Sequence, residues 1–234
     1  MKKLTAYFSL FALLTLNSFF AQGGTNYLEN RASLQNFTNA STSLAGGWIL
    51  AKEVDKTITG SIYLFPSWIG RYKVTNNEGF SAKLFNLNYN ILTNTLEVKI
   101  ANDSVYQFDN KKINYVNYAN KNYKFLENPD VNGMVLEIYK GNNLNLYKKT
   151  NLKVQEGSFN PMTQEKTERD KYIQVEVYYS DVKGKFEKIK LSKSAILNLV
   201  KDKDKEIKEF VKANKLDYSN EIDVAQILKH YESL

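Results

Sequence analysis

Cysteine is absent from the chain, and histidine occurs once, at His230. Without thiols the protein can form no disulfide, no thiolate nucleophile, no cysteine-ligated metal site and no acylated N-terminal cysteine. A zinc or transition-metal site would need carboxylates instead, because His230 alone supplies one imidazole at the end of the chain. We therefore expect His230 to lie on a C-terminal helix, and we expect no metal and no other cofactor.

The sequence also lacks the short motifs that mark catalytic and phosphate-binding sites. There is no G-x-S-x-G nucleophile elbow, and a lone C-terminal histidine makes a Ser/His/Asp set improbable. The glycine pairs at 23–24 and 46–47 lack the setting of a phosphate loop, and residues 202–204 (DKD) lack the rest of a calcium loop. We therefore expect no enzymatic activity. A hydrolase that uses two carboxylates stays open as an alternative, with candidates that one sequence cannot pair in space: Glu97, Asp109, Glu127, Glu137 and Glu156.

Arginine is scarce as well, since it occurs only at Arg31, Arg71 and Arg169, whereas lysine is spread along the whole chain. The net charge of +7 falls to about +5 if Lys2 and Lys3 leave with an N-terminal leader. Nucleic-acid-binding proteins gather basic residues on one face, and arginine is the better bidentate phosphate ligand. We therefore expect no nucleic-acid partner. Attraction to an anionic membrane surface, as a peripheral association, stays open beside ordinary solvated lysines.

Long apolar runs are missing except at the N-terminus, which has the pattern of a secretory leader. Lys2 and Lys3 precede a mostly apolar run from Leu4 to Phe20, and Ala21 before Gln22 fits a cleavage point. Residues 1–21 therefore predict a signal peptide and export across the inner membrane. The alternative is an uncleaved anchor, because the run approaches the length of a spanning helix.

Aromatic residues are abundant, and they are densest between Gly60 and Lys99, where Asn, Gly and Thr punctuate them. Strand and turn signals alternate from there to Leu191 at intervals of about 8–12 residues, which is typical of antiparallel strands joined by short turns. We predict a mainly β domain over residues 22–191, an antiparallel meander that forms a curved sheet or an incomplete barrel. A membrane-spanning barrel is the less favoured alternative, because the chain ends in a helix. The predicted strands cover residues 48–54, 61–65, 71–75, 80–91, 96–101, 105–108, 113–118, 123–127, 135–140, 144–148, 172–179 and 186–191.

Helical periodicity is found near both ends of the chain. Residues 27–37 fit a short helix loosely, and a polar loop is expected over 36–45. Residues 192–234 predict a tail of about three short helices, with Ser192 and Asn220 as N-caps, packed on or appended to the sheet. A tail that docks a partner is the alternative. The remaining segment, residues 156–170, is predicted to be a long polar loop.

Four aromatic side chains are candidates for contact with a partner or ligand. Trp68 is the first of them, because it lies between Pro66 and Gly70 in a turn, where packing constrains a side chain least. The others are also explained by packing within the sheet, because they alternate with polar residues. They are Tyr63, Tyr72 and Tyr178.

Several segments resemble a family of secreted proteins from bacteria of the Bacteroidetes type. They are the leader ending FFAQ, GSIYLFPSW, NLNYNILTNTLEVK with the following DSVYQFD, and the tail from Lys193 to Leu234. The resemblance implies the periplasm or the periplasmic face of the outer membrane, and it carries over no catalytic or binding residue. By analogy with small proteins that accompany outer-membrane or secretion assemblies, we expect a non-enzymatic subunit that binds another envelope protein. The alternative is a periplasmic carrier or sensor that holds a lipid, glycan or other small ligand in the curved sheet.

Overall fold

The computed structural model describes residues 22–40, 46–50, 57–102 and 104–234. The predicted signal peptide, the end of the predicted polar loop at 41–45 and residues 51–54 of the first predicted strand lie outside these ranges. Among the helices that are described, none combines the length and the hydropathy needed to cross a bilayer.

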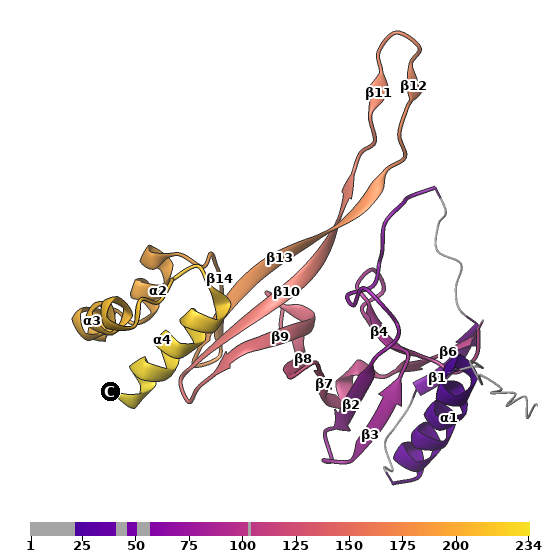
Figure 1. The fold of residues 1–234 in the computed structure, drawn as a ribbon, viewed down its shortest axis with the longest axis horizontal. Coiled ribbons are helices and arrows are strands. Elements are labelled where there is room, and N and C mark those ends of the chain that lie inside the picture. Colours follow the sequence, from indigo (N-terminus) through magenta and orange to yellow (C-terminus); the bar gives the residue numbers. More distant parts are fainter. Residues whose placement is uncertain (1–21, 41–45, 51–56, 103) are drawn as a thin grey trace, which may run out of the picture.

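An eight-stranded antiparallel sheet forms the centre of the molecule, in the order β14-β13-β10-β9-β8-β7-β2-β3 (Figure 1). Most strands that are neighbours in the sheet are also consecutive in the chain. Short turns join them, which is possible because the strands are antiparallel. The sheet stays open, with β3 and β14 at its edges. The predicted antiparallel meander with C-terminal helices is confirmed. Its strands are β2 Arg71–Asn76, β3 Ser81–Phe85, β7 Ile113–Tyr118, β8 Lys121–Glu127, β9 Asn132–Lys140, β10 Leu144–Gln155, β13 Lys171–Val182 and β14 Lys185–Ile189.

A second sheet of four strands arises because the predicted strand 80–91 is two strands. Asn86 has a left-handed φ of 53°, a conformation that asparagine tolerates better than most residues, and it turns the chain between them. β3 stays in the large sheet and β4 joins the small one, so the prediction of a single strand is wrong. The small sheet has the order β1-β6-β5-β4 and consists of β1 Gly46–Leu50, β4 Leu87–Asn90, β5 Thr95–Lys99 and β6 Ser104–Phe108.

The predicted strand 61–65 is also wrong, although its residues do lie beside β4. The segment forms a single antiparallel bridge, Tyr63 opposite Asn90, in place of a ladder. The side chain of Asn88 takes over part of the pairing, because it accepts a bond from the Phe65 N–H (2.9 Å) and donates one to the Phe65 carbonyl (3.0 Å). A proline follows directly and ends the pairing.

One end of the large sheet is covered by the small sheet and by α1, Gln22–Ala40. α1 packs Leu34 and Phe37 into the core between the sheets. Asn30 is fully buried and donates to the carbonyls of Phe85 (2.6 Å) and Lys99 (2.9 Å), which ties the helix to the ends of β3 and β5. The predicted short helix at 27–37 is therefore confirmed and is longer than expected.

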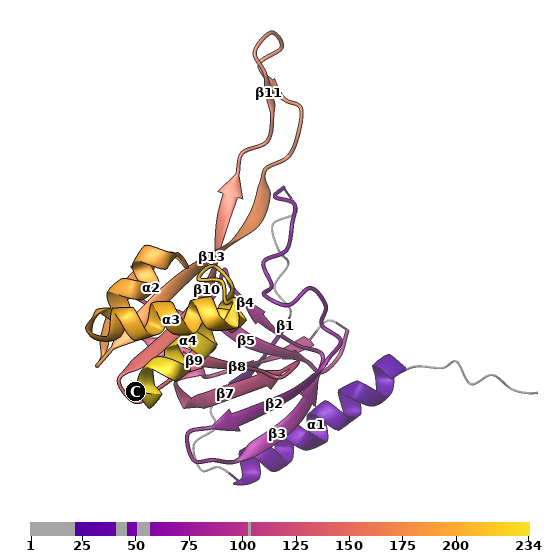
Figure 2. The same ribbon diagram turned by 60° about the vertical axis from the view of Figure 1, so that its left-hand side comes forward.

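The other end of the large sheet is covered by three C-terminal helices, which confirms the predicted tail (Figure 2). Ser192 and Asn220 cap α2 and α4 as expected, with side-chain oxygens that accept backbone N–H groups. The apolar stripes of the helices pack on Leu144 and Leu146 of β10. The apolar side of the helical tail is thus buried against the protein's own sheet. The helices are α2 Lys193–Leu199, α3 Asp204–Asn214 and α4 Glu221–Ser233, with short 3-10 turns at Asn110–Lys112 and Lys201–Lys203.

Both covers lie on the same face of the large sheet, which we call the inner face. The register Val116–Tyr123–Leu136–Lys148–Tyr178 runs across this face from β7 to β13. Side chains that alternate with these residues belong to the opposite, outer face.

Candidate functional site

β10 and β13 continue beyond the rest of the sheet as a two-stranded ribbon, which we call the arm, residues 150–177 (Figures 1 and 2). β9 and β14 pair with these strands only up to Lys149 and from Tyr178, respectively. Within the described chain, the only further backbone pairing along the arm strands is the parallel bridge of Thr59 with Lys171. The arm therefore presents two strand edges with open N–H and C=O groups, which are ready to pair with another chain.

The arm ends in a tight hairpin, so the predicted loop over residues 156–170 holds for most of the segment and is wrong only for Phe159–Asn160 and Glu165–Lys166, which pair as short strands. The side chain of Asn160 accepts a bond from the Met162 N–H, and its carbonyl accepts one from the Gln164 N–H, both at 2.9 Å. Pro161 lies inside this turn, where its fixed φ is pre-organised. The Asn-Pro pair is a turn signal that sequence reasoning missed. The hairpin strands are β11 Phe159–Asn160 and β12 Glu165–Lys166.

Large apolar side chains of the arm are exposed to solvent. Met162 is 93% exposed, Phe159 57% and Val154 50%. Charge does not distinguish the arm, because basic and acidic side chains balance between residues 150 and 171. They are Lys153, Lys166, Arg169 and Lys171 against Glu156, Glu165, Glu168 and Asp170.

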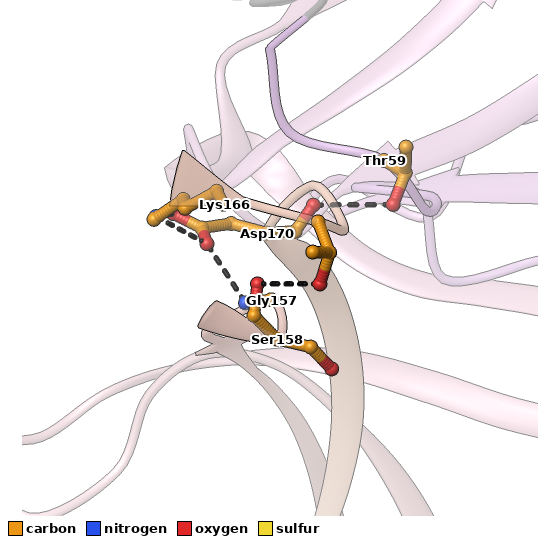
Figure 3. Close-up of polar contacts among 6 residues, drawn as sticks. Thr59, Gly157, Ser158, Lys166 and Asp170 are labelled. Atoms are coloured by element: carbon orange, nitrogen blue, oxygen red, sulfur yellow. Dashed lines mark hydrogen bonds and ion pairs between the residues drawn. The ribbon is translucent and has the colours of Figure 1, made fainter. Parts of the chain in front are cut away.

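Hydrogen bonds around Asp170 fix the hairpin on the end of the arm (Figure 3). The Asp170 carboxylate accepts from the Gly157 N–H (2.9 Å) and pairs with Lys166 (2.7 Å). These two contacts hold the pKa of Asp170 below its ordinary value, with the Lys166 bond contributing most. The Asp170 carbonyl accepts from the N–H (2.8 Å) and hydroxyl (3.1 Å) of Thr59, which ties the arm to the chain before β2. Gly157 allows the close approach, because a Cβ there would clash with the backbone of Glu168.

Tyr178, one of the predicted contact residues, lies at the root of the arm in a polar network on the inner face. Its hydroxyl donates to Glu221 at the start of α4 (2.8 Å), and Lys148 pairs with both Glu221 (2.8 Å) and Glu176 (3.0 Å). Burial, and then the bond to Glu221, raises the pKa of Tyr178 to about 12. The network joins β10 and β13 to the helical cover.

This network predicts acid-sensitive docking of α4. Burial would raise the pKa of Glu221, but the bonds from Lys148 and Tyr178 outweigh it and lower that pKa below 4.5. A lowered folded pKa stabilises the protein above the unfolded value, and the contribution is lost as the pH falls through the folded pKa. We expect Glu221→Gln to lower the unfolding free energy by about 1 kcal/mol at neutral pH and by progressively less as the pH falls below 4.5, in urea titrations.

The control for this prediction is Glu209→Gln, at an exposed glutamate of α3. It should leave the unfolding free energy unchanged at every pH. A difference between Glu221→Gln and the wild type that stays constant from neutral pH to pH 3 would show that the charge of Glu221 is not involved.

Trp68 and Tyr63 lie together beside the small sheet. Their rings meet edge to face at 4.7 Å, and the Lys99 ammonium lies 4.7 Å from the Trp68 ring centre. The Tyr63 hydroxyl donates to Glu97 (3.2 Å), a carboxylate that is only 3% exposed. Burial, and then the charge of Glu97, raises the pKa of Tyr63. Trp68 is half-buried, and its contact with a partner stays a prediction.

Tyr72, the fourth candidate, is 2% exposed and belongs to the core. It stacks on Tyr118 with ring centres 4.4 Å apart, and Phe65 packs against both rings. The four candidates therefore do not form one site: Trp68 and Tyr63 share a contact, whereas Tyr72 and Tyr178 lie elsewhere.

The space between the sheet and its covers is filled by the protein's own aliphatic and aromatic side chains. A cavity of about 260 Å³ remains on the inner face, between Phe65 on one side and Lys148 on the other, with Tyr118 and Tyr123 in its wall. Ligand pockets usually measure about 300–1,000 Å³. The inner face is thus a packed core with a small hollow.

Among the carboxylates considered for hydrolysis, Asp109 and Glu127 line one open hollow of about 580 Å³. Lys111 lies between them: its N–H donates to Asp109 (3.1 Å), and its ammonium lies 3.9 Å from Glu127. Glu127 and Lys111 are both more than half exposed, so water screens them. In the described ranges, no cluster of three or more acidic or histidine side chains is placed to hold a metal ion.

Burial thus assigns Tyr72 to the core, hydrogen bonds engage Tyr63 and Tyr178 within the protein, and the arm is left as the most exposed organised feature. Comparison with known proteins adds no relative to this description: no family model, no curated protein and no solved structure matches the chain.

Proposed function

We propose that the protein is a non-enzymatic binding protein that attaches to a partner protein through its arm. The observation that carries the proposal is an ordered ribbon that ends in exposed Phe159 and Met162 and has two open edges. With the predicted signal peptide, the partner is another protein of the cell envelope.

The tip supplies the apolar part of such a contact. Large exposed side chains that cluster on one element mark interaction sites more often than single scattered ones do. Phe159 and Met162 lie on the same hairpin, and methionine adapts its shape to an irregular pocket. Because charges on the arm balance, apolar burial rather than charge attraction drives this binding.

The open strand edges of the arm supply the main-chain hydrogen bonds of the proposed contact. An extended segment of a partner can add as a strand to an open edge and gain a series of backbone hydrogen bonds. On the β13 side Thr59 already pairs with Asp170 and Tyr172, where the ribbon meets the terminal hairpin, so the β10 side, from Thr150 to Gln155, offers the longer uninterrupted edge.

The hydrogen bonds at Asp170 and Asn160 make the arm rigid before it binds. A pre-organised element loses less conformational entropy on association than a flexible loop does. The carrier alternative is supported less well, because the core is filled and the hollow between Phe65 and Lys148 is small. The arm therefore favours protein binding.

The proposal predicts a site-specific contact at Met162. A photo-crosslinking amino acid introduced at this position should give one discrete adduct in intact cells of the source organism. Changing Phe159 to serine in the same chain should reduce the yield several-fold, because the neighbouring anchor of the contact is lost. The adduct is measured by immunoblot, and its partner is identified by mass spectrometry.

Leu92 provides the control, because it is 54% exposed but lies in the turn between β4 and β5, away from the arm. The crosslinker at this position should give no adduct of the same mass. Equal adducts from positions 92 and 162, or none from either, would contradict the proposal.

A further inference from the structure

A basic hollow lies on the outer face of the large sheet, away from the arm. Its volume is about 680 Å³, and it spans β2, β3 and the turn between β7 and β8. Four basic side chains line it and no carboxylate does. Its lining residues are Arg71, Tyr72, Lys73, Lys83, Leu84, Phe85, Asn117, Tyr118, Ala119, Asn120, Lys121 and Asn122.

Strand register brings three of these charges together. Lys73 of β2 lies directly opposite Lys83 of β3, and Arg71 follows two residues away on the same face of β2. Opposed residues on neighbouring strands lie about 5 Å apart at their Cβ atoms, and like charges in this position destabilise a sheet. Residues two apart on a strand are separated by about 7 Å. All three side chains are exposed.

Within the described residues, Arg71, Lys73 and Lys83 form no ion pair. Lys121 is partly engaged elsewhere, because its charge helps to lower the pKa of Glu221 on the inner side. Glu137 of β9 belongs to the outer face, opposite Asn122 of β8, and does not line the hollow.

The chemistry of the hollow selects the kind of anion. Two opposed ammonium groups and a guanidinium concentrate more charge than one carboxylate can neutralise. A phosphate group with two negative charges, or two linked phosphates, presents several oxygens within a few ångströms and accepts bidentate bonds from arginine. The asparagine amides at the β7–β8 turn add neutral donors. We propose that this basic hollow binds a phosphate-bearing ligand through Arg71, Lys73 and Lys83.

The mature chain is titrated with inorganic pyrophosphate at low salt in a calorimeter. Neutralising both lysines, in Lys73→Gln/Lys83→Gln, should weaken binding by at least about tenfold, since each charged hydrogen bond is worth more than a neutral one. The same variant should melt no lower than the wild type without anion, because it also removes the like-charge contact. A preserved melting temperature shows that it folds.

The matched control is Lys153→Gln/Lys188→Gln, which lowers the net charge equally at two exposed lysines outside the hollow. It should change pyrophosphate affinity by less than about twofold. If both double variants weakened pyrophosphate binding equally, the effect would come from net charge alone, and the proposal would be overturned. Absence of any binding of pyrophosphate to the wild type would overturn it as well.

Two further probes identify the source of the phosphate. Vesicles of phosphatidylcholine with phosphatidic acid, competed by pyrophosphate and not bound by the hollow variant, would assign the group to a lipid. Binding of pyrophosphate without binding to these vesicles would assign it to a free ligand. A polyglutamate peptide that binds the wild type and not the hollow variant, while pyrophosphate fails to bind, would assign the hollow to an acidic protein and overturn the phosphate assignment.

Discussion

Replacing Glu97 by alanine is expected to lower the free energy of unfolding by about 3–5 kcal/mol, because buried polar partners lose their acceptor. Glu97 is 3% exposed and accepts four hydrogen bonds. The donors are the Tyr63 hydroxyl (3.2 Å), the Thr95 hydroxyl (3.0 Å), the Gln107 amide (3.0 Å) and the Asn90 amide (3.3 Å). The measurement is a urea titration followed by tryptophan fluorescence.

Two control variants separate the hydrogen bonds from the charge. Glu97→Gln keeps one oxygen for the donors, so it should cost about 1 kcal/mol. Glu127→Ala removes an exposed carboxylate and should change the unfolding free energy by less than about 0.5 kcal/mol. If Glu97→Ala were no more costly than Glu127→Ala, then the four hydrogen bonds would not hold the segment of Tyr63 against the small sheet.

A second large effect is expected at Ile227, which is fully buried where α4 packs on the sheet. Ile227→Ala should lower the free energy of unfolding by about 2–5 kcal/mol, the sum of lost apolar burial and the cavity that remains. Amide exchange should then rise in α4 and at Leu144 and Leu146 of β10, which share its core. Both quantities are measured on the same purified protein.

Ile222 on the same helix provides a matched control. Its side chain is 70% exposed, so Ile222→Ala removes the same atoms from water instead of from the core. It should change stability by less than about 0.5 kcal/mol, and alanine's higher helix propensity favours a small gain. Similar losses for both variants would contradict the packing of α4 on the sheet.

The periodicity of the sequence predicts those elements whose partners are local. Residues 172–179 alternate cleanly and form β13, and the caps at Ser192 and Asn220 place α2 and α4. The break at Asn86 was missed although the hydrophobic alternation changes phase just before it, where the apolar residues Leu84 and Phe85 are adjacent. A single left-handed residue there sends β4 into another sheet, and that choice depends on contacts distant in sequence.

The candidate site was harder to predict for the same reason. Aromatic residues such as Tyr72 suggested contact with a partner, but aromatic strands also fill cores, and only the fold shows that this side chain is buried. The strand predicted at 144–148 was too short, because the polar composition of residues 149–155 hides their pairing with residues 171–177. The opposed Lys73 and Lys83 depend on strand register, which composition does not contain.

The continuity of β10 and β13 gives the protein a mechanical property. Each strand has twelve residues and spans about 40 Å. The ribbon is therefore a projecting beam whose free end is at Met162. Its fixed end is the Lys148–Glu221–Tyr178 network, where both strands are fastened to α4. A sideways load on the tip is therefore borne at the junction of sheet and helix and at the bonds of Thr59 with Asp170, and the stiffness of these attachments sets how accurately the tip is aimed.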